Sequence, residues 1–201
     1  MSQKPFFSDK NLSFAFLAPS SYNEVEVVVL KMLTTQISGL LQRIAGNGEE
    51  SIEETARLLA QATIGEGRVI IAAFGEMEAV TATAFYSTEP LSGAVRYDYG
   101  MDITAADRIW LLTRSAMDRP ALELAQQLAE HYIPFAALAA EKPGSGNELE
   151  DLSYTYISTG LTRGLLPGDD GERIVQPHAL SALFVYEAVK IAYDEMILDK
   201  D

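Results

Sequence analysis

The sequence predicts an α/β fold, a three-layer α-β-α sandwich with a mainly parallel, doubly wound sheet of five strands. One observation behind this prediction is the pair of uninterrupted apolar runs at 69–74 and 134–140, which are typical of strands buried on both faces. A second is that such runs alternate with stretches of helical periodicity, as expected where crossover helices connect parallel strands. With 201 residues, 48% of them apolar, the chain is long enough for one such core.

The composition limits the domain organisation and the partners. Residues 1–28 are expected to form a loosely ordered leader, and residues 29–201 the α/β domain. No apolar run approaches the roughly 18 residues that span a bilayer, and cysteine is absent, so we expect a cytoplasmic protein without a membrane segment. Acidic residues outnumber basic ones by 29 to 15, giving a net charge of −14, which disfavours nucleic acids and anionic membranes as partners.

Two helices are predicted before the first strand. Apolar residues recur every three or four positions from 29 to 44, and the helix that they predict breaks at the Gly-Asn-Gly sequence of residues 46–48. Ser51 and Glu54 have the spacing of a capping box, which predicts a new helix start, and Gly65 closes this second helix.

Strands and helices are expected to alternate after the first strand. Asp118 is predicted to be the N-cap of the middle helix, Trp110 to lie in the core, and His131 to have a structural role at a helix end. The predicted strands lie at 94–97, 108–113, 134–140 and 154–158, the helices at 76–86, 118–128 and 178–196, and the main loops at 141–148 and 161–173.

The candidate site lies in loops at one edge of the predicted sheet. Ligands of open parallel sheets bind beyond the carboxyl ends of the strands, where backbone N–H groups and helix N-termini attract anions. The loops at 74–78 and 113–119 follow two such strands, and a third strand ends in the hydroxyls of Ser158 and Thr159. The candidate ligand-binding residues are Phe74, Gly75, Glu76, Thr113, Arg114, Ser115, Asp118, Ser158 and Thr159.

Neither a metal nor a dinucleotide cofactor is expected. Asp98, Asp102 and Asp107 do not have EF-hand spacing and no histidine joins them, so we interpret them as part of a solvated loop. The turn at Phe74 and Gly75 lacks the G-x-G-x-x-G spacing of a dinucleotide-binding loop.

These features together resemble a sugar isomerase (SIS) domain over residues 30 to 198. The resemblance lies in the helices before the first strand, the glycine-bearing loop Ala73-Phe74-Gly75-Glu76 and the long last helix. Within that class the chain is similar to an uncharacterised Gram-positive family of SIS-like proteins, some of which are provisionally named phosphoheptose isomerase. The resemblance implies a flavodoxin-type sheet and the binding of a phosphorylated sugar or sugar derivative.

The most specific motif of SIS domains is a Ser-x-Ser-Gly-x-Thr loop that wraps the phosphate of the sugar. Residues 112–118 fall on this motif, with Thr113 and Ser115 at the two hydroxyl positions. Ala116 replaces the glycine and Asp118 replaces the final threonine. An aspartate at that position would repel phosphate, an effect that the two neighbouring arginines could offset.

The resemblance also implies candidate catalytic residues. In heptose-phosphate isomerases, proton transfer is shared by a histidine near the start of the last helix and a glutamate in the helix after the first loop. His178 falls on the histidine, but the glutamate position falls near residues 86–87, so the partner is missing unless Glu76, Glu78 or Glu89 substitutes. The chain is therefore either an isomerase with His178 as acid/base or a non-catalytic phosphosugar-sensing or partner-binding module.

Two further expectations concern fold class and assembly. A different doubly wound domain, such as a nucleotide-binding one, is disfavoured by the helices before the first strand and by the loop spacing. SIS proteins resemble one another in pairing, which implies a homodimer or homotetramer in which the apolar face of residues 29–44 could take part.

Overall fold

The computed structural model describes residues 22–198, and residues 1–21 of the expected leader lie outside them. Five parallel strands form one sheet in the order β2-β1-β3-β4-β5, which confirms the predicted fold class and its doubly wound order. The strands are β1 (Val69–Ala73), β2 (Ala94–Arg96), β3 (Arg108–Leu112), β4 (Phe135–Ala139) and β5 (Thr155–Ser158).

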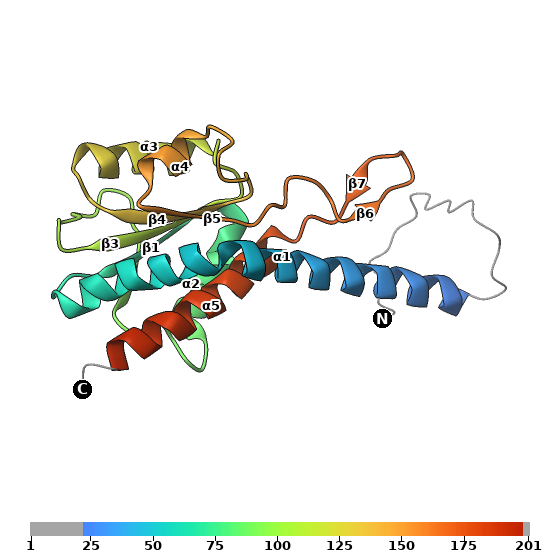
Figure 1. Ribbon diagram of the computed structural model, residues 1–201, viewed down its shortest axis with the longest axis horizontal. Coiled ribbons are helices and arrows are strands. Elements are labelled where there is room, and N and C mark those ends of the chain that lie inside the picture. The colour runs from blue at the N-terminus through green and yellow to red at the C-terminus, as the bar shows by residue number, and fades with distance from the viewer. Residues whose placement is uncertain (1–21, 199–201) are drawn as a thin grey trace, which may run out of the picture.

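Helices cover both faces of the sheet (Figure 1). One face packs against α3 (Arg119–Glu130) and α4 (Glu148–Leu152), and the other against α1 (Tyr22–Ile64), α2 (Glu78–Tyr86) and α5 (His178–Leu198). A short 3-10 helix, η1 (Gly75–Met77), joins β1 to α2. None of the helices within residues 22–198 has the length and apolarity that a membrane span requires.

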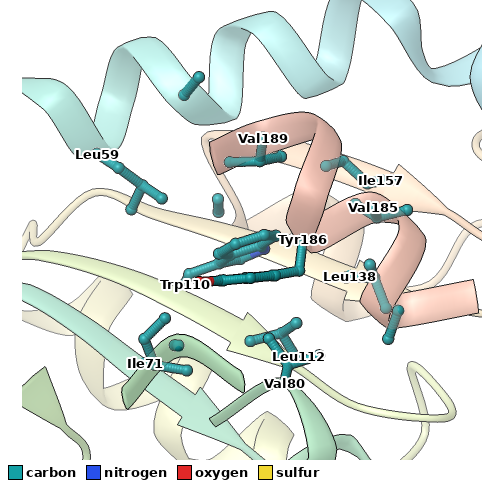
Figure 2. Packing of buried hydrophobic residues seen from close by; sticks show 14 of the residues in the cluster. Leu59, Ile71, Val80, Trp110, Leu112, Leu138, Ile157, Val185, Tyr186 and Val189 are labelled. Carbon is teal, nitrogen blue, oxygen red and sulfur yellow. The ribbon is translucent and has the colours of Figure 1, made fainter. Parts of the chain in front are cut away.

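The larger of the two cores is centred on a pair of stacked aromatic rings (Figure 2). Trp110 of β3 and Tyr186 of α5 are almost fully buried, with ring centroids 6.2 Å apart and planes inclined by 17°. Leu59 of α1 and Val189 of α5 belong to the same cluster. Because α5 packs over the middle of the sheet, its first residue, His178, is held near the carboxyl ends of the strands.

The prediction of two helices before the first strand was wrong, because α1 is continuous for 43 residues. Ser51 lies inside this helix and its hydroxyl donates to the carbonyl of Gly48, so it caps no helix. Two mid-helix glycines cost about 1 kcal/mol each relative to alanine. Buried Leu40 and Ile44 precede the glycines, and buried Ala56 follows them in the same core cluster, so packing on one core offsets that cost.

The expected leader, residues 1–28, overlaps the start of α1. The helix begins at Tyr22, so residues 22–28 are helical. The N-terminal part of α1 extends beyond the sheet (Figure 1). An antiparallel hairpin of β6 (Leu166–Pro167) and β7 (Arg173–Ile174) begins in the predicted connection at 161–173 and ends one residue beyond it.

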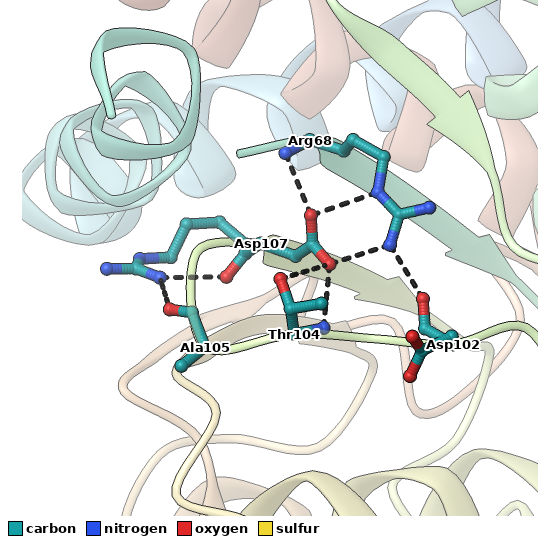
Figure 3. A network of polar contacts seen from close by, with 6 residues as sticks. Arg68, Asp102, Thr104, Ala105 and Asp107 are labelled. Carbon is teal, nitrogen blue, oxygen red and sulfur yellow. Dashed lines mark hydrogen bonds and ion pairs between the residues drawn. The ribbon is translucent and has the colours of Figure 1, made fainter. Parts of the chain in front are cut away.

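Asp107 is not part of a solvated loop, as the sequence had suggested, but is buried with an exposed fraction of 2% (Figure 3). Its carboxylate accepts from the main-chain N–H and the guanidinium of Arg68, at 2.7–3.0 Å, and from the N–H and hydroxyl of Thr104. These donors hold the pKa of Asp107 well below its usual range, with the Arg68 side chain as the largest cause. The ion pair links the start of β1 to the loop before β3, at the sheet edge opposite the candidate site.

Candidate functional site

The loops that were predicted to form a site meet at the carboxyl edge of the sheet. The strand register aligns Ala73 with Leu112, Leu112 with Leu138, and Ala139 with Ser158, so four strands end side by side. Main-chain bonds continue past the strand ends, from Phe74 N–H to the Leu112 carbonyl at 2.9 Å and from Thr113 N–H to the Leu138 carbonyl at 3.0 Å.

The β3–α3 loop forms an oxyanion-binding turn at Ser115 and Ala116. The Ser115 hydroxyl and the Ala116 N–H both point at one carboxylate, that of Glu141, at 2.7 Å each. The N–H of Met117 donates to the Ser115 Oγ at 3.2 Å, which orients the hydroxyl. Two convergent donors on one planar anion are the arrangement that also binds phosphate oxygens.

Asp118 precedes α3 as predicted, but its side chain does not cap the helix. Its Oδ2 instead accepts from the Thr113 hydroxyl at 2.9 Å. Thr113 is fully buried, so this bond satisfies a hydroxyl that lies below the loop. The two hydroxyl positions of the motif thus differ in role: Ser115 faces the anion, and Thr113 holds the loop together through Asp118.

His178 lies at the start of α5 and is 5% exposed. Burial lowers the pKa of its imidazole below 6.5, with Arg114 acting in the same direction and Glu76 and Glu141 in the opposite one. These charges come from the loops after β1, β3 and β4, so the histidine is within electrostatic reach of all three. The ring Nε2 lies 3.3 Å from the Gln176 side-chain oxygen.

Of the three glutamates that were expected to act with His178, Glu76 is the one whose charge raises the pKa of the imidazole. Glu76 lies in η1, directly after β1, and its charge acts on the imidazole. Glu78 is paired with Arg96 at 2.9 Å. Glu89 is exposed in the loop beyond α2, and Tyr86, near the position expected for the glutamate of heptose-phosphate isomerases, is 88% exposed.

The loop after β5 completes the edge. Ser158 Oγ accepts from the Gly160 N–H at 3.1 Å, and Thr159 N–H donates to the Ala139 carbonyl at 2.9 Å. Thr159 is buried, with 4% of its surface exposed. Its hydroxyl accepts from the Leu161 N–H and therefore has a structural role. Ser158 is half-buried and lies closer to the surface of the edge.

Glu141 is the residue of this site that sequence reasoning missed. It had been placed in a loop because Pro143 and two glycines follow it, and no motif marks it. Its position directly after β4 and Ala140 was a usable signal, because β4 ends at the same edge as β1, β3 and β5. Tyr156 of β5 donates its hydroxyl to the Glu141 carbonyl at 3.0 Å, and burial raises the pKa of that phenol.

Within residues 22–198 no three histidine, aspartate or glutamate side chains are grouped as metal ligands. Gly75 has a φ of +60° and open space at its Cβ position, so the first loop presents main chain at the edge.

Comparison with known proteins gives a family and a fold. A family model described as Domain of unknown function (DUF2529) matches residues 29–197. The uncharacterised protein YwjG of Bacillus subtilis (strain 168) is 29% identical over 171 residues, which are 84% of this chain and 98% of that protein.

Solved structures share the arrangement of the sheet and helices at low sequence identity. The E. coli CFT073 protein c3406 in complex with A5P has a TM-score of 0.65 at 15% identity, covering 89% of this chain and 94% of that one. Phosphoheptose isomerase GmhA from Neisseria gonorrhoeae has a TM-score of 0.61 at 14% identity, covering 85% and 99%. The Vibrio vulnificus NanR protein complexed with ManNAc-6P has a TM-score of 0.58 at 13% identity, covering 88% and 66%. The chain therefore has an SIS-like fold.

Proposed function

The chain belongs to the DUF2529 family, and we propose that it binds a phosphorylated sugar or sugar derivative at the carboxyl edge of its sheet. The observation that carries the proposal is the turn at Ser115 and Ala116, whose hydroxyl and N–H converge on a carboxylate. A turn that holds one oxyanion has the donors to hold another, such as the phosphate of a ligand. The complexes of c3406 with A5P and of NanR with ManNAc-6P support the ligand class.

The rest of the ligand is proposed to lie between this turn and the start of α5. Arg114 is exposed beside the turn and supplies a positive charge toward a phosphate. The main chain at Gly75, the Ser158 hydroxyl and the imidazole of His178 offer hydrogen bonds to sugar hydroxyls. Such a ligand bridges the loops after β1, β3 and β5, which explains why the polar residues gather where these strands end.

A thermal-shift panel of sugar phosphates, their unphosphorylated sugars and nucleotides tests this function. One saturating ligand at a hundredfold excess over its Kd stabilises a protein by about 2.7 kcal/mol. We expect at least one sugar phosphate to raise the melting temperature, with no effect of the same sugar without phosphate. A response to nucleotides alone would replace the proposal by a nucleotide-binding function.

A second candidate function is phosphosugar isomerisation, which the packing of α5, the helix of His178, against η1, the helix of Glu76, favours. Aldose–ketose isomerisation moves a proton from one carbon of the sugar to its neighbour, and a second proton between the two oxygens. A buried imidazole that is neutral near pH 7 can accept the carbon-bound proton, and the Glu76 carboxyl group can serve the oxygens. The carbon proton exchanges with solvent during this step, so turnover in D₂O labels the product.

NMR of the responding sugar phosphate in H₂O and D₂O distinguishes an enzyme from a sensor. An isomerase converts the sugar with deuterium incorporation, and His178→Ala abolishes the conversion while His131→Ala, at the far end of α3, leaves it unchanged. Binding without conversion supports the non-catalytic module. This alternative is favoured by the exposed Tyr86, which lies near the position expected for the glutamate of heptose-phosphate isomerases. Normal turnover by His178→Ala would remove the acid/base role.

We also propose that two or four copies assemble in the cytosol. Near its N-terminal end, α1 exposes Leu30 and Met32, at 62% and 42%. Burying such residues against a second copy is favourable at about 25 cal/mol per Å² of apolar surface. Light scattering should give a dimer or tetramer at micromolar concentration, and a monomer alone would contradict this assembly.

A further inference from the structure

The anion-binding turn is filled by the chain's own side chain. Ser115 has a single hydroxyl proton and Ala116 a single N–H, and both are directed at the two oxygens of the Glu141 carboxylate. A phosphate cannot receive the same two hydrogen bonds while Glu141 remains in place. Resting on the proposed function, we infer that Glu141 is an internal competitor that sets the affinity and the charge preference of the site.

The surroundings of Glu141 allow its side chain to leave while its main chain stays. The carbonyl of Glu141 accepts from the Tyr156 hydroxyl, and the adjacent Ala140 N–H donates to the Arg114 carbonyl. The residue itself is half-buried at the carboxyl edge of the sheet, so rotation about its side-chain bonds can take the carboxylate to solvent. The loops that form the turn can therefore keep their positions when a ligand enters.

Competition of this kind lowers the apparent affinity to the intrinsic affinity multiplied by the fraction of molecules in which the turn is open. The competition also selects among ligands. A phosphate dianion forms stronger hydrogen bonds with the Ser115 hydroxyl and the Ala116 N–H than a neutral sugar does, so only the phosphate displaces the Glu141 carboxylate. The site should therefore prefer phosphorylated ligands strongly, although the carboxylates of Glu76, Asp118 and Glu141 repel a phosphate. Removing Glu141 should raise the affinity for a sugar phosphate and leave that for the free sugar unchanged.

Isothermal titration of a responding sugar phosphate into Glu141→Ala, Glu141→Gln and the wild type tests the inference. Glu130→Gln, an exposed residue at the far end of α3, makes the same change of charge as a control. We expect Glu141→Ala to bind at least tenfold more tightly, a difference of about 1.4 kcal/mol. Glu141→Gln should gain less, because its amide oxygen still accepts from the Ser115 hydroxyl.

Three other outcomes are distinguishable. Equal gains for the alanine and glutamine variants overturn the inference, because charge alone then accounts for the effect. Binding by the wild type with no gain in either variant overturns it as well, and leaves the proposed function standing. If neither the wild type nor the variants bind any sugar phosphate, the proposed function fails and the inference with it. In the ligand-free protein, Glu141→Ala should also shift the amide NMR signal of Ala116, and an unchanged signal contradicts the contact itself.

Discussion

The substitution Asp107→Asn tests whether a buried carboxylate holds the start of β1 to the loop before β3. One oxygen accepts from the main-chain N–H and Nε of Arg68, and the other accepts from Arg68 Nη2 and from the N–H and hydroxyl of Thr104. Asparagine has one acceptor oxygen, and its NH₂ group must face the remaining donors. Two or three donors therefore lose their acceptor whichever way the amide is turned.

The magnitude follows from these donors. Each unsatisfied buried donor costs about 1–3 kcal/mol. The Arg68 side chain is 40% exposed, so water replaces part of what its guanidinium loses. We expect Asp107→Asn to lower the free energy of unfolding by about 2–4 kcal/mol. For a domain of this size, that corresponds to a fall in melting temperature of about 4–15 °C.

Chemical denaturation of the wild type, Asp107→Asn and Asp102→Asn provides the assay. Asp102 contacts the same guanidinium through its main-chain carbonyl, so Asp102→Asn should change stability by less than about 0.5 kcal/mol. The folded pKa of Asp107 lies below its unfolded value, so the difference between the wild type and Asp107→Asn is complete above about pH 4 and shrinks as the pH falls further. Equal stability of Asp107→Asn and Asp102→Asn at pH 7 would refute the reasoning.

Three further predictions concern other elements of the fold. Gly46→Ala should stabilise the protein by about 0.5–1 kcal/mol, because Gly46 lies in a continuous helix with open space at its Cβ position. Denaturant midpoints measure this change, and a loss of stability would indicate that α1 is broken at Gly46. Gly67→Ala should destabilise by about 1–3 kcal/mol, because a Cβ atom would lie 1.9 Å from the Ala106 carbonyl oxygen; an unchanged melting temperature would contradict that close approach. The pKa of His178 is lower in the folded protein than in the unfolded one, so the wild type should lose stability relative to His178→Gln as the pH falls below about 6.5; parallel curves from pH 7.5 to 5 would exclude the shift.

The strands were predictable because they are short, apolar and buried on both faces. Val69 to Ala72 and Phe135 to Ala139 are buried without alternation, which is the pattern of parallel strands covered by helices. Their carboxyl ends must lie at one edge, and this rule alone brought Gly75, Ser115 and Ser158 to the same region before any contact was known.

The helices were less predictable because local propensity competes with packing. The glycines at 46 and 48 are weak helix formers, but α1 continues through them because Ile44 and Ala56 face one core. The short helix α4 was not predicted because its five residues contain a single fully buried side chain, Leu149. Its N-cap is Asn147, whose side chain accepts from the Glu150 N–H.

The site was predictable as a place but not in its hydrogen bonds. Asp118 has the sequence position of an N-cap, and only the tertiary structure shows that its carboxylate accepts from Thr113. Glu141 lies 26 residues from Ser115 in the chain, so no local pattern could reveal that it occupies the turn. In both cases the side chain has several possible hydrogen-bond partners within reach. The spacing of residues in the sequence does not determine which of them it binds.

The turn at Ser115 and Ala116 is proposed to receive the phosphate of a sugar phosphate. Amide NMR of the labelled protein during titration with the ligand identified by thermal shift measures this directly. The claim predicts that the signals of Ser115, Ala116 and Gly75 shift together and saturate with the Kd found by calorimetry, while the unphosphorylated sugar leaves Ser115 and Ala116 unchanged. Saturating shifts confined to another surface of the protein would contradict it.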